Sequence, residues 1–231
     1  MENNTGYCNC CRSSVIFEVK AAWLRDNYLC QNCSSIPRQR HIQYILDQNY
    51  PGWDALTIHE SSPSNDYISR YCTDYTASQY IEHQILGSMV NGVRCENIEN
   101  LSFQSSMFDI FITQDVLEHV FNPEKALMEI NRTLKPGGIH IFTAPKHKGL
   151  SSSRVRAKLN EDTGEILHLM DAEYHGNPVG DGKALVTWDY GSDFEFLMSS
   201  WTQKPVVTFL TKDKEHGLDG EYLEVFIIKN F

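Results

Sequence analysis

Residues 108–143 read FDIFITQDVLEHVFNPEKALMEINRTLKPGGIHIFT, and this stretch decides the fold. Residues 108–113 form an almost continuous apolar run, which is typical of a central strand in a parallel sheet. Asn-Pro-Glu at 122–124 predicts a helix start, because asparagine caps helix N-termini and proline suits the first helical position. Lys-Pro-Gly-Gly at 135–138 ends that helix, and residues 139–143 form the next strand. This order predicts an α/β fold with a parallel sheet and right-handed crossovers.

Shorter apolar runs on both sides extend the sheet. Further strands are predicted at residues 56–58, 75–77, 95–98, 206–210 and 222–228. The last two are separated by a polar loop, so we expect them to form a terminal antiparallel hairpin. A short helix is expected to run through Ile68, between the first two of these strands. Residues 37–48 predict another helix, whose apolar face contains Ile42, Ile45 and Leu46.

The composition narrows the classes of function. Apolar residues make up 41% of the 231, so a packed core can form and a disordered chain is excluded. The formal net charge of -10 argues against nucleic acid or an anionic membrane as the main partner. No run of about 18 apolar residues could span a bilayer, and residues 1–11 do not resemble a secretory signal. We therefore expect a cytoplasmic protein without a membrane partner.

Cysteine spacing near the N-terminus predicts a metal site. Cys8 with Cys11, and Cys30 with Cys33, form two C-x2-C pairs, which is the spacing of a four-thiolate zinc site. Four thiolates leave no open coordination position, so the zinc is expected to be structural. Cys10 could replace Cys8 as a ligand in a looser pairing, and four free thiols are the alternative to a metal. We expect a zinc knuckle and a connecting helix over residues 1–50, followed by one domain over residues 51–231.

Four segments in the second domain match a known family in order and spacing. They are residues 101–103 (LSF), 108–112 (FDIFI), 115–120 (DVLEHV) and 134–138 (LKPGG). Together they resemble the class I S-adenosylmethionine (SAM)-dependent methyltransferases of the type 11-like group. The resemblance implies a Rossmann-like, seven-stranded sheet with one antiparallel strand, and a ligand site at the carboxyl ends of its parallel strands. It also implies that residues 149–191 form an insertion around the methyl acceptor.

The resemblance implies four cofactor-binding loops. The first starts at the acidic Glu60, but serines stand where the family usually has glycines that let the backbone approach the ligand. The implied SAM-binding residues are Glu60, Ser61, Ser62, Ser64, Ser78, Gln79, Asn97, Ile98, Gln114, Asp115 and His119. Asp115, Glu118 and His119 would share one helical face. A similar acid-x-x-acid-His set is associated with a divalent cation in ubiquinone-pathway O-methyltransferases, so a second metal here stays open.

Methyl transfer to a hydroxyl group benefits from a base beside the acceptor, and histidine suits that role at neutral pH. His147 follows the strand at 139–143, and His175 lies in the insertion, so both are candidate catalytic residues. The expected function is methyl transfer from SAM to a small-molecule or sugar acceptor, at oxygen. The alternative is a non-catalytic protein that keeps the fold but no longer binds SAM through its serine-rich loop. A protein or RNA methyltransferase is a third hypothesis, and the acidic charge counts against RNA.

Overall fold

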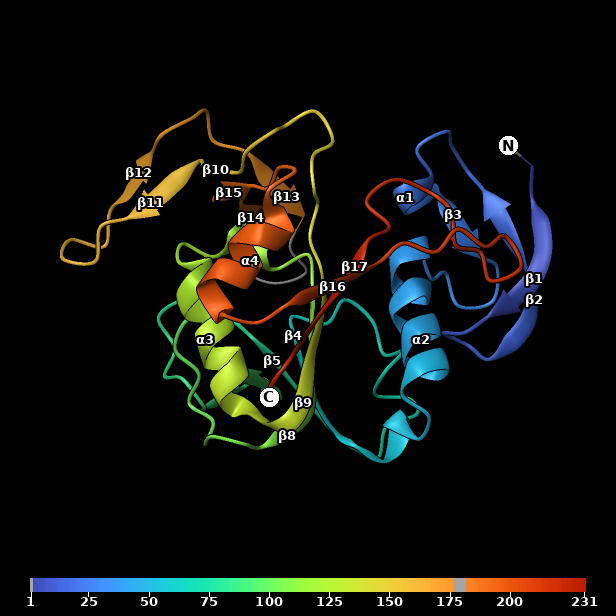
Figure 1. Cartoon of the computed structure of the whole chain (residues 1–231), viewed down its shortest axis with the longest axis horizontal. Helices are drawn as coiled ribbons and strands as arrows, with labels where there is room; N and C mark the ends of the chain where they lie inside the picture. The colour runs from blue at the N-terminus through green and yellow to red at the C-terminus, as the bar shows by residue number, and fades with distance from the viewer. Residues whose placement is uncertain (1, 177–181) are drawn as a thin grey trace.

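A computed structural model describes residues 2–176 and 182–231. Eight strands of the described residues form one central, mostly parallel sheet in the order β16-β17-β9-β8-β4-β5-β7-β6 (Figure 1). These strands are β4 (Thr57–Ser61), β5 (Asp74–Gln79), β6 (Met89–Val90), β7 (Val93–Cys95), β8 (Phe108–Gln114), β9 (Leu134–Thr143), β16 (Val206–Phe209) and β17 (Val225–Lys229). The sheet therefore has one strand more than the family pattern implied. β16 and β17 pair antiparallel, which confirms the predicted terminal hairpin.

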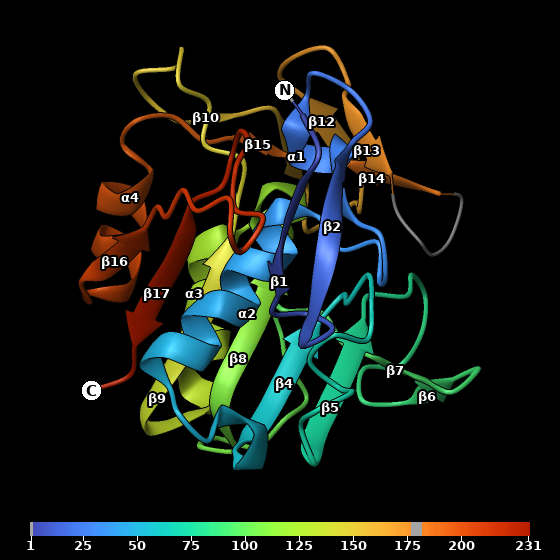
Figure 2. The same ribbon diagram turned by 90° about the vertical axis from the view of Figure 1, so that its right-hand side faces the viewer.

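Helices cover both faces of the sheet, which makes three layers (Figures 1 and 2). α3 (Pro123–Thr133) and α4 (Phe194–Thr202) pack on one face against Phe111, Phe142 and Phe226. α2 (Pro37–Asn49) packs on the other face, where Ile110, Ile112 and Ile141 are buried. Because successive residues of a strand point to opposite faces, β8 and β9 need apolar residues on both. Burial on both faces of the sheet therefore explains the almost continuous apolar run at residues 108–113.

The helix between β8 and β9 begins as predicted. The Asn122 side chain accepts a hydrogen bond from the Lys125 amide, and Leu127 and Ile130 are buried. Its end differs from the prediction, because β9 already starts at Leu134 and runs through the two glycines. A Cβ on Gly138 would lie 2.9 Å from the Asp109 carbonyl oxygen, so glycine allows this close approach to β8.

An N-terminal module lies beside α2 (Figure 1). It contains β1 (Asn4–Cys8), β2 (Ser13–Val19), α1 (Leu24–Asn27) and β3 (Tyr28–Cys30), with the strands paired antiparallel. α2 follows and confirms the helix predicted at 37–48, with Ile42, Ile45 and Leu46 buried. A 3-10 turn, η1 (Trp53–Ala55), leads from α2 to β4.

The helix expected through Ile68 is wrong. Residues 67–71 form turns, in which the Arg70 amide donates to the Asp66 carbonyl and the Cys72 amide donates to the Ile68 carbonyl. The Asn65 side chain accepts from the Tyr67 amide, and such local bonds compete with helix formation. Tyr67 is buried against the cysteine cluster, so tertiary packing fixes this segment.

Residues 149–176 and 182–191 contain three small two-stranded ribbons. They pair β10 (Arg154–Val155) with β15 (Trp188–Asp189), β11 (Ala157–Leu159) with β12 (Ile166–His168), and β13 (Tyr174–Gly176) with β14 (Lys183–Leu185). The 3-10 turn η2 (Leu117–His119) meets this insertion, since the Thr187 amide donates to the Glu118 carbonyl. Within residues 2–176 and 182–231, no helix has the length and apolar character needed to cross a bilayer.

Candidate functional site

The carboxyl ends of β4, β5 and β8 lie side by side. Ser61 pairs with Ser78 on one side and with Thr113 on the other. Glu60, one residue earlier, is buried and accepts hydrogen bonds from the Tyr75 hydroxyl at 2.9 Å and from the Gln114 amide at 2.7 Å. Burial raises the pKa of Glu60 to about 7, although both hydrogen bonds act to lower it. A titratable acid therefore lies near the carboxyl end of β4.

The loop after β4 turns sharply without a glycine. Ser62 has a φ of 55°, the left-handed region that glycine adopts most easily, and its amide donates to the Ser78 carbonyl at 2.7 Å. Ser64 is exposed and bonds Gln39 of α2 at 3.4 Å. The serine loop thus forms the turn that a glycine would make, and α2 holds it from the side.

Two arginines of the N-terminal segment reach the carboxyl end of β8. Arg25 of α1 and Arg38 of α2 both pair with the carboxylate of Asp115, which follows β8. The Thr143 hydroxyl donates to the same carboxylate at 2.8 Å. Burial alone would raise the pKa of Asp115, but the guanidinium groups of Arg38 and Arg25 lower it below its usual range. Sequence reasoning missed both arginines, because the family motifs begin only after α2.

Buried polar atoms without a hydrogen-bond partner gather at this edge. Among the described residues they include Arg25 Nη1, Gln79 Oε1, Gln114 Oε1 and both carboxylate oxygens of Glu118. Unpaired buried polar atoms are rare in proteins, because each one loses its bonds to water. Those of Gln79 and Gln114 lie at the carboxyl ends of β5 and β8, on either side of β4, and they indicate a site for a polar ligand.

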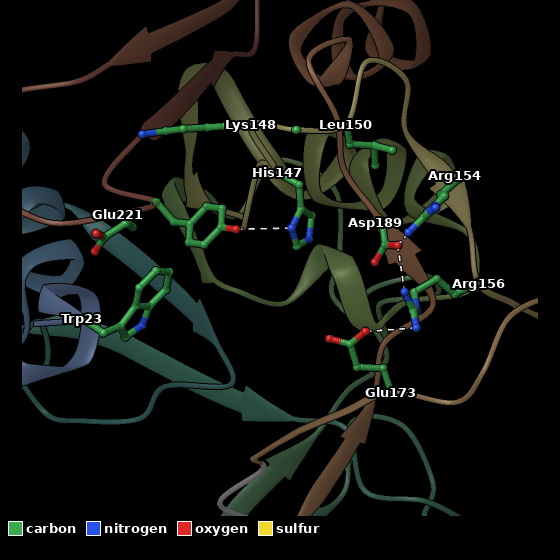
Figure 3. A pocket seen from close by; sticks show the side chains of 11 residues that line it. Trp23, His147, Lys148, Leu150, Arg154, Arg156, Glu173, Asp189 and Glu221 are labelled. Carbon is green, nitrogen blue, oxygen red and sulfur yellow. Dashed lines mark hydrogen bonds and ion pairs between the residues drawn. The ribbon is translucent and has the colours of Figure 1, made fainter.

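A cavity of about 600 Å³ opens beyond the edge, between the N-terminal module and the insertion (Figure 3). His147 lines it, and the Tyr222 hydroxyl lies 3.3 Å from its Nδ1. On the opposite wall Arg156 pairs with Glu173 at 3.0 Å and with Asp189 at 2.8 Å. The remaining lining residues are Trp23, Lys148, Gly149, Leu150, Arg154 and Glu221.

Glu118, His119 and His175 meet beside the cavity. The rings of His119 and His175 contact edge to face, with centroids 5.1 Å apart. Burial lowers the pKa of both histidines, while burial and the neighbouring Asp115 raise the pKa of Glu118 well above its usual range. His175 therefore lies beside Glu118 and His119 and not in the lining of the cavity, and its catalytic role stays a prediction.

Four cysteine sulfurs of the N-terminal module converge. Cys8 Sγ lies 3.7 Å from Cys33 Sγ, and Cys11 Sγ lies 3.9 Å from Cys30 Sγ. Two thiolates on one tetrahedral zinc ion, at about 2.3 Å each, are about 3.8 Å apart, so the four sulfurs fit zinc. Burial raises the pKa of Cys11 to about 11, so this thiol is protonated without a metal and would release its proton on binding zinc. Cys10 is buried nearby but does not belong to the four-sulfur group.

Comparisons with known proteins agree with this architecture. Residues 65–142 match the family model of the methyltransferase domain. A curated protein of Schizosaccharomyces pombe, described as an uncharacterized methyltransferase, is 33% identical over 95 residues, which are 41% of this chain. A crystal structure of a SAM-dependent methyltransferase from Mesorhizobium loti has a TM-score of 0.52 at 12% identity, covering 82% of this chain and 97% of its own. The chain is thus similar to SAM-dependent methyltransferases in its central segment and in its fold.

The extent of these similarities is uneven. The match spans 33% of the length of the curated yeast relative. A SAM-dependent methyltransferase structure from Listeria monocytogenes has a TM-score of 0.49 and 12% identity, and covers 83% of this chain and 97% of its own. The 12% identity of the Mesorhizobium structure shows a shared fold and says nothing of an acceptor.

The side chains predicted to bind the cofactor do not all face one space. The Ser78 hydroxyl bonds His59 Nε2 at 2.9 Å inside the core, whereas Gln79 keeps a buried, unpaired oxygen. The Asn97 side chain accepts from the Glu99 amide at 2.9 Å, and Ile98 packs into the core. Ser78 is thereby committed to the protein interior, which sequence spacing could not show.

Proposed function

We propose that this methyltransferase transfers the methyl group of SAM to a hydroxyl group of a small, polar acceptor, with a sugar as the favoured class. The observation that carries the proposal is the cluster of unpaired buried polar atoms at the carboxyl ends of β5 and β8. SAM offers ribose hydroxyls, an ammonium and a carboxylate, which match amide oxygens, a carboxylate and a guanidinium.

The proposed cofactor site uses the backbone of Ser61, Ser62 and Ser64 around the adenosyl group. Gln79, Asn97 and Ile98 lie on the side of β5 and β7, where we assign the ribose and adenine. Glu60, Gln114, Asp115 and His119 lie toward the methionine end. Arg25 and Arg38 both pair with Asp115, and Arg38 also pairs with Asp26 at 2.9 Å, so the two arginines face two carboxylates. Arg25 Nη1 is buried without a hydrogen-bond partner among the described residues, and we assign it to the methionine carboxylate.

The acceptor is proposed to occupy the 600 Å³ cavity. Trp23 is 45% exposed and offers an aromatic wall, which suits the apolar face of a sugar ring. Glu221 Oε2 and Arg156 Nε are buried without hydrogen-bond partners among the described residues, so an acceptor and a donor are available for hydroxyl groups. His147 is the proposed base, because it lines this cavity and can take a proton from the reacting hydroxyl.

Methyl transfer needs little covalent chemistry from the protein, because SAM carries the activated methyl group. The acceptor oxygen forms a bond to the methyl carbon as the carbon–sulfur bond breaks. The bonding electron pair passes to sulfur, which leaves neutral S-adenosylhomocysteine (SAH). The proposed contribution of the side chains is to align oxygen, carbon and sulfur and to accept the hydroxyl proton.

We also propose that Cys8, Cys11, Cys30 and Cys33 bind one structural zinc ion. The two sulfur–sulfur distances of 3.7 and 3.9 Å support it. The N-terminal module has a small apolar cluster of its own, which is consistent with a fold that depends on the metal.

Calorimetric titration with SAH tests the cofactor proposal. We expect binding in the micromolar range, followed by SAH release when SAM is offered with a panel of sugars, phenols and amines. Absence of SAH binding at about 1 mM would instead favour the non-catalytic alternative, in which Arg25 and Arg38 permanently occupy Asp115. Turnover with amines but not with hydroxyl compounds would overturn methylation at oxygen.

A further inference from the structure

A second group of side chains that could bind a metal lies after the carboxyl end of β8, apart from the cysteines. Glu118 and His119 belong to η2, and His175 belongs to β13 of the insertion. One ligand atom from each residue lies within 4.8 Å of the others. Segments far apart in the sequence therefore bring two imidazoles and one carboxylate together.

Glu118 is the unusual member of this group. Its side chain is buried, and neither carboxylate oxygen has a hydrogen-bond partner in the described part of the chain. The nearest basic atom is His119 Nε2, 3.9 Å from Oε1. A buried carboxylate without a partner is strongly disfavoured, and a bound cation would supply the missing contact.

The two histidines are held in a way that suits a ligand role. His119 Nδ1 lies 2.9 Å from the Leu185 carbonyl oxygen, so Nδ1 donates a proton there and Nε2 keeps its lone pair on the side of Glu118. Metal-binding histidines are commonly fixed by such a bond from the other ring nitrogen. Glu173 lies 3.9 Å from His175 Nε2 and provides a neighbouring carboxylate for the second ring.

We propose that Glu118, His119 and His175 bind one divalent transition-metal ion, separate from the zinc at the cysteines. Donors on one such ion, at about 2.0–2.2 Å each, are at most about 4.3 Å apart. The 3.9 Å between Glu118 and His119 already meets this limit, and rotation of the partly exposed His175 closes the remainder. Two imidazoles with one carboxylate suit zinc, cobalt, iron(II) or manganese.

This donor set differs from the one that the sequence left open. Asp115 was the third member there, but its carboxylate is held by Arg25, Arg38 and the Thr143 hydroxyl. His175 takes its place, from a segment about 60 residues after Asp115 whose position no local motif predicts. The insertion therefore completes the site.

The location gives the ion a role in methyl transfer, and this role, unlike the site, rests on the proposed function. Glu173 lines the acceptor cavity and neighbours His175, so the ion is accessible from that cavity. A hydroxyl group bound to a divalent ion ionises more readily. His147 accepts the released proton, and the acceptor oxygen attacks the methyl group as described above.

Cobalt titration of the zinc-loaded full chain tests the site without SAM or acceptor. Metal analysis first establishes one zinc per chain, so that the cysteines are occupied. We expect one further Co²⁺ to bind, with weak visible bands and no thiolate charge-transfer band, because the ligands are nitrogen and oxygen. Glu118→Gln and His175→Gln should each weaken this binding at least about tenfold.

His168→Gln is the matched control, because His168 is an exposed histidine of the same insertion and should leave cobalt binding unchanged. Thermal melting of the apo variants checks that Glu118→Gln still folds, and the partly exposed His175 provides a second variant that does not disturb the core. No saturable Co²⁺ binding up to about 1 mM, or equal binding in both variants and wild type, would overturn the site. SAH titration of the same samples remains an independent result.

Discussion

Arg38 Nε lies 3.0 Å from the Asp115 carboxylate, so an ion pair joins the N-terminal segment to the carboxyl end of β8. Arg25 pairs with the same carboxylate, and its buried Nη1 has no hydrogen-bond partner among the described residues. Arg38→Ala and Arg25→Ala should each weaken SAH binding about 10- to 100-fold, because a charge-assisted bond to the methionine carboxylate is lost. Isothermal titration calorimetry measures the change.

Lys20→Ala provides a control for charge at a distance, since Lys20 is exposed in the same module and pairs with Glu18. Its SAH affinity should equal that of wild type. If the arginine variants also bound SAH normally, the assignment of the methionine carboxylate to this pair would be wrong.

The main sheet could be predicted from the sequence because its signals are local. The apolar run at 108–113 and the Asn122 cap each report on their own segment, and both were confirmed. The Ser78 hydroxyl and the Arg38 pair depend on which distant residues they meet, namely His59 and Asp115. Spacing along one chain does not contain that information, so those parts of the site needed the fold.

Ser62 makes a glycine-like turn, and replacing it tests the serine loop. A non-glycine residue at a φ of 55° is strained by about 1 kcal/mol, part of which glycine returns through the greater freedom of the unfolded chain. Ser62→Gly should therefore raise the free energy of unfolding by up to about 1 kcal/mol and preserve SAH binding. Urea denaturation and calorimetry measure both quantities.

Ser64→Gly is the matched substitution two residues later, where φ is not positive. It should leave stability unchanged or lower it slightly, because no strain is relieved there. A larger gain from Ser64→Gly than from Ser62→Gly would contradict the strain at Ser62.

Burial of Glu60 should make the free energy of unfolding decrease as the pH rises. Its pKa is raised from 4.5 to about 7, so the folded chain holds a proton that the unfolded chain releases. This contribution is present below pH 4.5 and is lost as the pH rises to about 7, a decrease of about 3 kcal/mol. Urea denaturation of wild type and Glu60→Gln across this range should show the difference, since glutamine does not titrate.

Glu161→Gln, at an exposed loop position, controls for the general effect of removing one carboxylate. Its difference from wild type should stay constant with pH. A constant difference for Glu60→Gln as well would mean that Glu60 is ionised in the folded protein throughout.

Zinc removal should disturb residues 62–67, the loop after β4, because two contacts join this loop to the N-terminal segment. The Tyr67 hydroxyl donates to the Cys33 carbonyl at 2.6 Å, and Gln39 bonds Ser64 at 3.4 Å. Loss of the metal should unfold the cysteine module and so release residues 62–67, with SAH binding weakened at least about tenfold. Hydrogen exchange before and after chelation measures the release, and β8 and β9 should stay protected as the internal reference. Unchanged exchange in residues 62–67 would show that the loop is ordered without zinc.

His147 is expected to act on the acceptor and not on the cofactor, because it lines the cavity and lies beside Tyr222. Once the SAH-release screen has identified an acceptor, His147→Gln should lower kcat by about 10²- to 10⁴-fold and leave the SAH dissociation constant unchanged. Tyr222→Phe removes only the hydroxyl that contacts the ring, so its effect on kcat should be much smaller. The residual rate of His147→Gln should increase with pH, since a hydroxyl that ionises without help reacts faster in base. A variant that loses SAH binding and turnover together would show that His147 supports the fold of the site instead of the proton transfer.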